Sequence, residues 1–216
     1  MKYEMIFFDL DGTITDSALG IMNSIKYALE KNSLPMLSEE QLRSFIGPPL
    51  REQFCKVCGL TDAEGAKMVV DYREYYKDKG IFENRVYDGV METLRNLKEK
   101  GYRLAVATSK PEIFARQIAD YFGFSEYFEL IGGACMDESR TDKYEVIEYV
   151  LDSCQIKERN RVVMIGDRSH DMIGAKRAGL HSIGVLYGYG SKEELEQSGA
   201  EVLAETPKEV ISMLEG

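Results

Sequence analysis

Acidic, hydroxyl and lysine side chains follow separate apolar segments of this sequence, and such side chains together can bind a cation and a phosphoryl group. Any one of them alone would be an ordinary solvated loop residue. Together they are more informative, because each lies either just beyond an apolar segment or at the start of a helical pattern. The candidates, in chain order, are Asp9, Asp11, Thr108, Ser109, Lys143, Asp167 and Asp171.

The charges of this group indicate what it binds. Four carboxylates and one lysine cannot stay close together and ionised unless a cation joins them or their pKa values rise. Oxygen donors without a nearby cysteine favour a hard divalent cation, Mg²⁺ before Zn²⁺. Hydroxyl groups, backbone amides and a lysine suit a phosphoryl group. The pattern predicts a site that binds phosphate only together with a metal ion.

Asp9 and Asp11 are two residues apart, so they lie on the same side of an extended segment. The turn at Gly12 can then direct both carboxyl groups, and its own backbone amide, toward one substrate. One carboxylate can attack phosphorus as a nucleophile, and its neighbour can act as general acid and base. The alternative is that Asp11-Gly12 is only a turn dipeptide.

The apolar segments alternate with helical patterns through most of the chain. Short apolar runs that read as strands cover residues 4–8, 103–108, 128–132, 161–165, 181–185 and 201–203. Helical patterns cover residues 90–100, 111–122, 143–153 and 171–178, and further helices begin near residues 192 and 207. Continuous apolar strands that alternate with helices predict an α/β fold with a doubly wound parallel sheet covered on both faces. The candidate residues then meet at the carboxyl edge of that sheet.

One gap interrupts this alternation. Residues 16–80 contain helical patterns only, including the capping-box sequence Ser38-Glu39-Glu40-Gln41. We therefore predict a core of residues 1–15 and 81–216 and an inserted helical domain of residues 16–80. An insertion after the first strand would lie over the carboxyl ends of the strands, where open α/β sheets bind ligands.

Composition excludes several partners. The 216 residues carry a net charge of −10, which disfavours binding to nucleic acid or to an anionic membrane. No apolar run approaches the ~20 residues of a membrane span, and the first one is too short for a signal peptide, so we expect a cytoplasmic protein.

Cys55 and Cys58 form a single C-x-x-C in a helical pattern without a second pair, which favours reduced, structural thiols.

Four segments of the sequence resemble the motifs of the haloacid dehalogenase superfamily, in the order and spacing of its phosphatases. These are Asp9-Leu10-Asp11-Gly12-Thr13, Thr108-Ser109-Lys110, Lys143, and Gly166-Asp167-Arg168-Ser169-His170-Asp171. The resemblance covers nearly the whole chain. It implies a doubly wound core with a helical cap domain inserted after the first strand.

The resemblance also implies roles for individual residues. Asp9 would be the nucleophile and Asp11 the general acid and base. Thr108, with Ser109 and the Gly12 turn, would bind the phosphoryl group, and Lys143 would neutralise it. Mg²⁺ would be held by Asp9, by the backbone carbonyl of Asp11 and by Asp167, with Asp171 acting through a metal-bound water or by orienting Lys143.

Two further segments are most similar to the branch that holds phosphoglycolate phosphatases and bacterial 5′-nucleotidase-like proteins. The loop of residues 46–51 could present Arg51 to a second polar group of the substrate, or Arg51 could be an exposed helix residue. Residues 187–191 (Tyr-Gly-Tyr-Gly-Ser) could equally be a loop whose glycines only permit turns.

These observations favour a Mg²⁺-dependent phosphomonoesterase that acts on a small soluble ester such as phosphoglycolate or a nucleoside 5′-monophosphate, as a monomer or a homodimer. A sugar-phosphate mutase of the same superfamily shares the aspartate pair. Thr13 favours hydrolysis by a phosphatase over the reaction of a mutase. A phospho-accepting signalling domain also gathers acids, a hydroxyl and a lysine around Mg²⁺, but it would have no helical insertion and no second aspartate two residues beyond the acceptor.

Overall fold

In the computed structural model, which describes residues 2–137 and 139–215, the chain divides into two units. The first contains the residues up to Thr15 together with those from Val86 onward, and the second is Asp16–Arg85. The structure thus ends the inserted segment at Arg85 instead of residue 80. The reason is local: the backbone N–H of Gly20 donates to the carbonyl of Glu83, and Arg85 forms an ion pair with Asp16.

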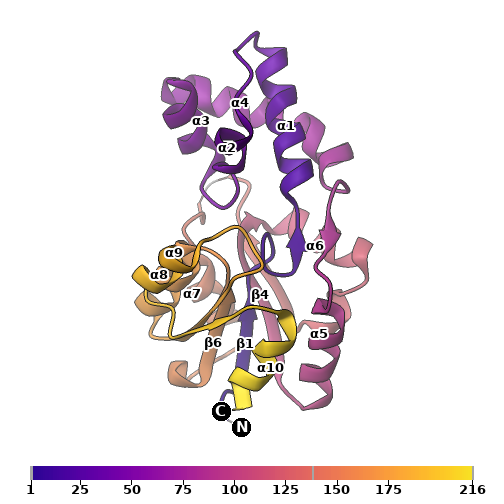
Figure 1. The fold of residues 1–216 in the computed structure, drawn as a ribbon, viewed down its shortest axis with the longest axis vertical. Helices are drawn as coiled ribbons and strands as arrows, with labels where there is room; N and C mark the ends of the chain where they lie inside the picture. Colours follow the sequence, from indigo (N-terminus) through magenta and orange to yellow (C-terminus); the bar gives the residue numbers. More distant parts are fainter. Residues whose placement is uncertain (1, 138, 216) are drawn as a thin grey trace. The chain divides into compact units, whose positions relative to one another are not determined.

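A six-stranded sheet forms the centre of the first unit. Its strands, in spatial order, are β5 (Leu130–Ala134), β4 (Arg103–Pro111), β1 (Met5–Phe8), β6 (Val162–Gly166), β7 (His181–Val185) and β8 (Val202–Ala204). All neighbouring strands are parallel, and Phe8 at the end of β1 lies opposite Val106 of β4 and Ile165 of β6. The strands run side by side in Figure 1, so their carboxyl ends share one edge. The predicted α/β fold with a parallel sheet is confirmed.

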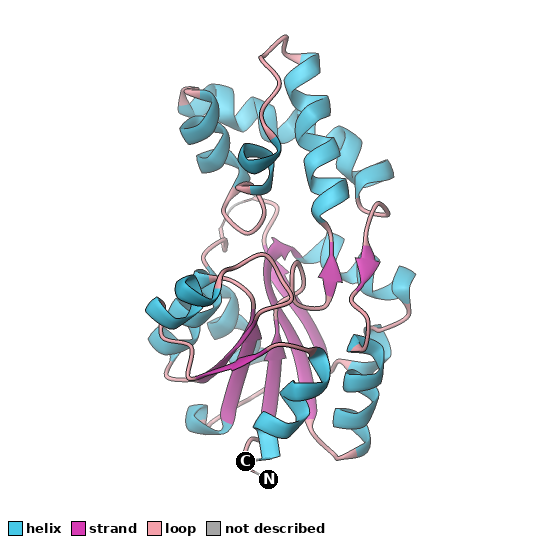
Figure 2. Cartoon of the chain, in the orientation of Figure 1, coloured by secondary structure: helices cyan, strands magenta, loops and turns pink. Residues whose placement is uncertain are grey.

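Helices cover the sheet on both faces (Figure 2). They are α5 (Val90–Glu99), α6 (Glu112–Phe122), α7 (Lys143–Ser153), α8 (Ser169–Ala178), α9 (Lys192–Gln197) and α10 (Pro207–Glu215), with short 3₁₀ turns at Ser125–Tyr127 and Arg159–Arg161. Alternate residues of a strand point to opposite faces. Met5 and Phe7 of β1 belong to a buried cluster with α7 and α8, whereas Ile6 and Phe8 are buried on the other face. This burial explains why the strand reads as a continuous apolar run.

The second unit is helical. Its helices are α1 (Ala18–Lys31), α2 (Glu39–Arg43), α3 (Leu50–Cys58) and α4 (Asp62–Tyr75), and α4 continues into a π-helical turn at Tyr76–Gly80. The predicted capping box is present, because the Ser38 hydroxyl accepts from the Gln41 N–H while the Gln41 side chain accepts from the Ser38 N–H. The segments that lead into and out of this unit contain β2 (Thr15–Asp16) and β3 (Arg85–Val86), which pair with each other. Two residues are too few to show the apolar pattern of a strand, so β2 and β3 were not predicted from the sequence.

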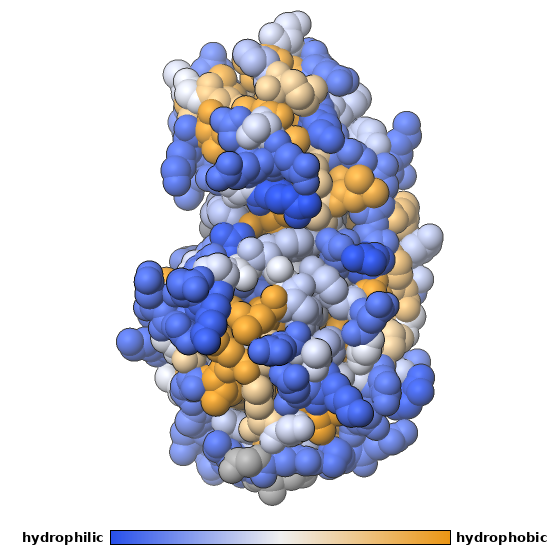
Figure 3. All heavy atoms as spheres, in the orientation of Figure 1, coloured by the Kyte–Doolittle hydropathy of each residue, from blue (hydrophilic) through white to orange (hydrophobic). Residues whose placement is uncertain are grey.

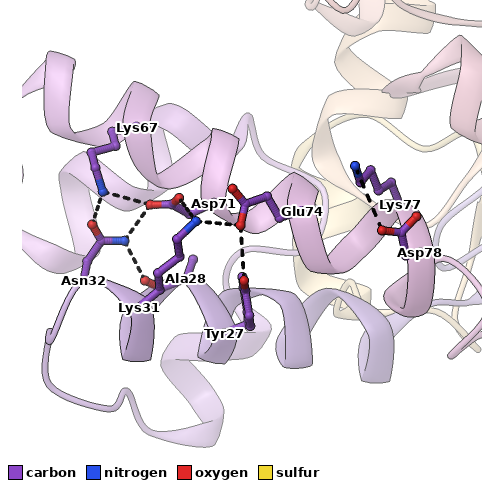
Figure 4. A network of polar contacts seen from close by, with 9 residues as sticks. All are labelled: Tyr27, Ala28, Lys31, Asn32, Lys67, Asp71, Glu74, Lys77 and Asp78. Carbon is purple, nitrogen blue, oxygen red and sulfur yellow. Dashed lines mark hydrogen bonds and ion pairs between the residues drawn. The ribbon is translucent and has the colours of Figure 1, made fainter.

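A buried carboxylate joins α1 to α4 within the helical unit (Figure 4). Asp71 is 4% exposed and accepts from Asn32 Nδ2 at 2.7 Å, and the ammonium groups of Lys31 and Lys67 lie 2.8 and 3.0 Å from its oxygens. Burial alone would raise the pKa of Asp71, but these three donors together hold it well below its usual range. The network therefore fixes the contact between the two longest helices of this unit.

Hydrophilic side chains cover most of the face shown in Figure 3, in each unit, with smaller hydrophobic areas between them. None of the helices that the structure describes is long and apolar enough to cross a membrane.

Candidate active site

Asp9 stands directly after β1, where the chain leaves the sheet. Its backbone N–H still donates to the carbonyl of Ile165, which continues the pairing with β6 by one residue. The chain then turns at Gly12, whose φ of +88° favours glycine, and the Gly12 N–H closes the turn on the carbonyl of Thr15. The Asp9 side chain is consequently held at the carboxyl edge of the sheet with 8% of the residue exposed.

Lys143 connects two of the predicted carboxylates. It is the first residue of α7, whose start is fixed by a capping box between Asp142 and Glu145. Its ammonium lies 2.8 Å from an oxygen of Asp9 and 2.8 Å from an oxygen of Asp171, and it donates to the Ala107 carbonyl at 2.9 Å. Burial by itself would lower the pKa of Lys143, but the two carboxylates raise it, so the lysine stays charged.

Asp167 and Asp171 complete a buried acidic group with Asp9. Each of the three residues offers a carboxylate oxygen, and these oxygens lie within 4.8 Å of one another. Asp171 accepts from the backbone N–H of Arg168 at the start of α8. Burial raises the pKa of Asp167 well above its usual value, and the nearby charges of Asp171 and Asp9 raise it further. Burial, with the charge of Asp171, also raises the pKa of Asp9, against the opposing effect of Lys143.

This group fits a divalent metal ion. Its donors are carboxylate oxygens, which hard cations prefer. Two observations support this fit: the carboxylates lie close enough to repel one another, and the raised pKa values of Asp9 and Asp167 indicate that ionising these two groups is costly until a positive charge is added. Counting Lys110 and Lys143 against the four predicted aspartates leaves two negative charges, which one divalent cation would neutralise.

Asp11 has a partner that the sequence did not reveal. The ammonium of Lys110 donates to both oxygens of Asp11, at 2.8 and 2.6 Å, and both side chains are largely buried. Lys110 lies in an irregular stretch of β4, where the register with β5 shifts between Thr108 and Pro111. In the same stretch the hydroxyl of Thr108 hydrogen-bonds to Asp9, and the backbone N–H of Lys110 donates to that hydroxyl at 3.2 Å.

The remaining predicted site residues are Ser109, Gly12 and Arg51, and they lie in different parts of the chain. Ser109 is half-buried between Thr108 and Lys110. Gly12 lies against Asp167, where a Cβ atom would overlap the carboxylate. Arg51 belongs to the helical unit and forms an ion pair with Asp62. Cys55 and Cys58 are free thiols of α3, and the acidic group described above does not include them.

A parallel sheet with buried carboxylates and a lysine at its carboxyl edge defines an α/β enzyme core of the kind that binds ligands at this edge. Residues 6–185 match the haloacid dehalogenase-like hydrolase family, and the chain belongs to this family. Relatives of the chain include proteins named as a 5′-nucleotidase and as phosphoglycolate phosphatases.

The relatives carry several names. The chain is 44% identical over 195 residues to a 5′-nucleotidase of Pseudomonas aeruginosa, covering 90% of this chain and 88% of the relative. It is 38% identical to the tyrosine-protein kinase PtkA of Mycobacterium tuberculosis, covering 93% of this chain and 68% of the relative. It is 28% identical to a phosphoglycolate phosphatase of Vibrio parahaemolyticus, covering 98% and 96%.

Among solved structures, a predicted phosphatase from Clostridium acetobutylicum superposes with a TM-score of 0.95 at 42% identity, and the match covers all of both chains. The similarity thus extends over the core and the helical unit alike.

Proposed function

We propose that this protein is a Mg²⁺-dependent phosphomonoesterase that hydrolyses a small phosphate ester through a phosphoaspartyl intermediate on Asp9. One observation carries the proposal: the Asp9 carboxylate is buried, paired with Lys143, hydrogen-bonded to Thr108 and grouped with Asp167 and Asp171. Lys143 and Thr108 hold this carboxylate in one orientation, and the lysine charge offsets the repulsion between the ionised carboxylate and an anionic ester.

The metal ion belongs to this proposal because the donor set fits it. Asp9, Asp167 and the backbone carbonyl of Asp11 would hold Mg²⁺, with Asp171 close by. When bound, the ion supplies positive charge that offsets the negative charge of the phosphoryl oxygens.

In the first step, an oxygen of Asp9 attacks phosphorus while the bond from phosphorus to the ester oxygen breaks. Asp11, which takes up a proton before this step and gives up part of its ion pair with Lys110, donates that proton to the departing oxygen, so an alcohol leaves and Asp9 carries the phosphoryl group. Lys143 and the hydroxyl of Thr108 already contact Asp9, and they are positioned to bind the phosphoryl oxygens as charge accumulates there.

In the second step, water attacks the phosphorus of phosphoaspartate. Asp11, now ionised, takes a proton from that water, and the bond between phosphorus and the Asp9 oxygen breaks. Inorganic phosphate leaves, and Asp9 and Asp11 return to their starting states. The same residue thus acts first as acid and then as base.

The helical unit is proposed to act as a cap domain that selects the ester, with Arg51 as its candidate substrate-reading residue. The names of the relatives support a phosphoglycolate-like ester or a nucleoside 5′-monophosphate. A cytoplasmic location accords with such a substrate, and the oligomeric state expected from the sequence, a monomer or a homodimer, is part of the same proposal.

The test is hydrolysis of p-nitrophenyl phosphate and of a panel of small phosphate esters, with inorganic phosphate as the measured product. We expect EDTA to abolish phosphate release and added Mg²⁺ to restore it. Activity that persists in the chelator would overturn the metal assignment. Substrate consumption without phosphate release would instead favour transfer to another hydroxyl, as in a sugar-phosphate mutase.

A further inference from the structure

The loop between β7 and α9, residues 187–191, lies against Asp167 in the first unit. Its two glycines, Gly188 and Gly190, do not have positive φ angles, so they are not required by an unusual backbone conformation. The interpretation that these glycines only permit turns therefore fails, and another reason for their small size must exist.

The reason is the close approach of the loop to Asp167. A Cβ atom on Gly188 would overlap the carbonyl oxygen of Gly12 and the Asp167 side chain, with the Asp167 Oδ2 atom only 2.6 Å away. A Cβ atom on Gly190 would overlap the backbone carbonyl oxygen of Asp167. Both positions thus face the same residue from one loop, and neither has room for a side chain.

This close approach allows a direct hydrogen bond. The backbone N–H of Tyr189, between the two glycines, donates to Asp167 Oδ2 at 2.8 Å. The other carboxylate oxygen, Oδ1, accepts from the hydroxyl of Thr13 at 3.2 Å. The orientation of the Asp167 carboxylate is therefore fixed by two donors that come from opposite ends of the sequence.

Tyr187 attaches the same loop to the turn after β1. Its hydroxyl donates to the backbone carbonyl of Thr13 at 3.2 Å, and its ring makes an edge contact with the ring of Tyr87. The loop and the Thr13 segment, which supply the two donors to Asp167, are thus joined to each other as well.

We propose that residues 187–190 form a positioning loop for Asp167, which sets the orientation of this carboxylate toward a divalent cation. Gly188 and Gly190 are positioning residues, because they let the Tyr189 N–H reach the carboxylate. This inference rests on the proposed function in one respect, namely that Asp167 is a metal ligand. Groups that orient a ligand typically change metal affinity about 10- to 100-fold when they are altered.

The experiment measures the Kd of Mg²⁺ by isothermal titration calorimetry for the full chain and for Gly188→Ala and Gly190→Ala. We expect both variants to bind Mg²⁺ at least about tenfold more weakly than the wild type. The matched control is Gly123→Ala at the end of α6, where the φ of +74° strains an alanine but no atom lies within 4 Å of the new Cβ. That control should lose stability and keep its Mg²⁺ affinity.

A milder variant keeps the test decisive if the alanine variants do not fold. Tyr187→Phe removes only the hydroxyl that holds the loop to Thr13, and we expect this variant to bind Mg²⁺ about tenfold more weakly than the wild type, which is the lower end of such effects. Thermal unfolding in EDTA, measured for every variant, separates loss of metal affinity from loss of fold.

The outcomes separate the inference from the function on which it rests. Wild-type protein that binds no Mg²⁺ would overturn the proposed metal site itself. Wild-type binding together with unchanged affinity in the folded loop variants, or an equal loss in Gly123→Ala, would overturn the positioning role alone.

Discussion

The ammonium of Lys110 lies 2.6 and 2.8 Å from the two carboxylate oxygens of Asp11, and the side chains are only 6% and 14% exposed. Lys110 thus determines where the proposed general acid and base lies. An isolated carboxylate in such a largely buried place would be costly, because an unpaired charge loses its hydration without compensation.

Replacing Lys110 by methionine should therefore disturb protonation of the leaving group more than attack on phosphorus. We expect kcat for an alkyl phosphate to fall at least about tenfold, because general acid catalysis contributes at least that much for a poor leaving group. The loss should be smaller for p-nitrophenyl phosphate, whose leaving group needs little protonation. Equal losses on both esters would show that Lys110 has only a structural role.

Substitutions should distinguish the proposed roles of Asp9 and Asp11, the two aspartates that follow β1. Asp9→Asn removes the attacking oxygen, so we expect neither hydrolysis nor a phosphoenzyme. Asp11→Asn keeps the nucleophile but loses the acid and base, so phosphoenzyme should still form from a good leaving group and then turn over about 10²–10⁴-fold more slowly. Mass spectrometry of acid-quenched protein measures the phosphoenzyme. A fully active Asp9→Asn variant would contradict the assignment.

Because the pKa of Asp167 is raised in the folded protein, the stability of the fold should depend on pH. A carboxyl group whose pKa is higher in the folded than in the unfolded protein stabilises the fold below the unfolded value, here 3.8, and this contribution is lost as pH rises through the folded value. In EDTA at pH 7, Asp167→Asn should therefore unfold at a higher temperature than the wild type, and the difference should vanish toward pH 4. Added Mg²⁺ should raise the unfolding temperature of the wild type and leave that of the variant unchanged. A variant that is less stable in EDTA at pH 7 would refute this account.

Sequence reasoning located the acidic group but not the contacts that orient it. The carboxyl ends of parallel strands meet at one edge of the sheet. The apolar pattern of the strands was therefore enough to place Asp9, Thr108 and Asp167 close together. The pair of Lys110 and Asp11 depends on an irregular stretch of β4, which carries the strand to Pro111 although its apolar run ends at Thr108. The close packing of Gly188 on Asp167 joins the loops that follow two different strands, β7 and β6. Neither contact has a local sequence pattern.

The boundaries of the elements differ for similar reasons. The strand predicted at residues 128–132 is found at Leu130–Ala134, because a 3₁₀ turn at Ser125–Tyr127 occupies the preceding segment and Phe128 completes its hydrogen bonding. Elements with a clear start signal are reproduced at their first residue, as at Lys143 and Pro207. Local capping is thus easier to predict than the point at which a strand begins to pair.

Arg51 remains the proposed substrate-reading residue of the helical unit, and its ion pair with Asp62 provides a control. We expect Arg51→Ala to raise KM for the best ester of the panel several-fold more than for p-nitrophenyl phosphate. Asp62→Ala breaks the same ion pair but keeps the arginine, so it should leave that preference intact. If both variants affect both esters alike, Arg51 serves only to hold α3 to the start of α4.

Asp71 should be a main determinant of the stability of the helical unit (Figure 4). Asp71→Asn keeps the size of the side chain but removes the charge that Lys31, Lys67 and Asn32 contact, and we expect a loss of about 1–3 kcal/mol in the free energy of unfolding. Because the pKa of Asp71 is lower in the folded protein, its contribution is present above the unfolded value of 3.8 and is lost as pH falls through the folded value.

The difference between wild type and Asp71→Asn should accordingly be largest near pH 7 and shrink below about pH 4. Urea unfolding at several pH values measures it. Glu74→Gln is the matched control, because Glu74 also pairs with Lys31 but is exposed, and solvent-exposed ion pairs contribute little. A loss in Glu74→Gln as large as that in Asp71→Asn would mean that the number of ion pairs, and not the burial of Asp71, stabilises the contact between α1 and α4.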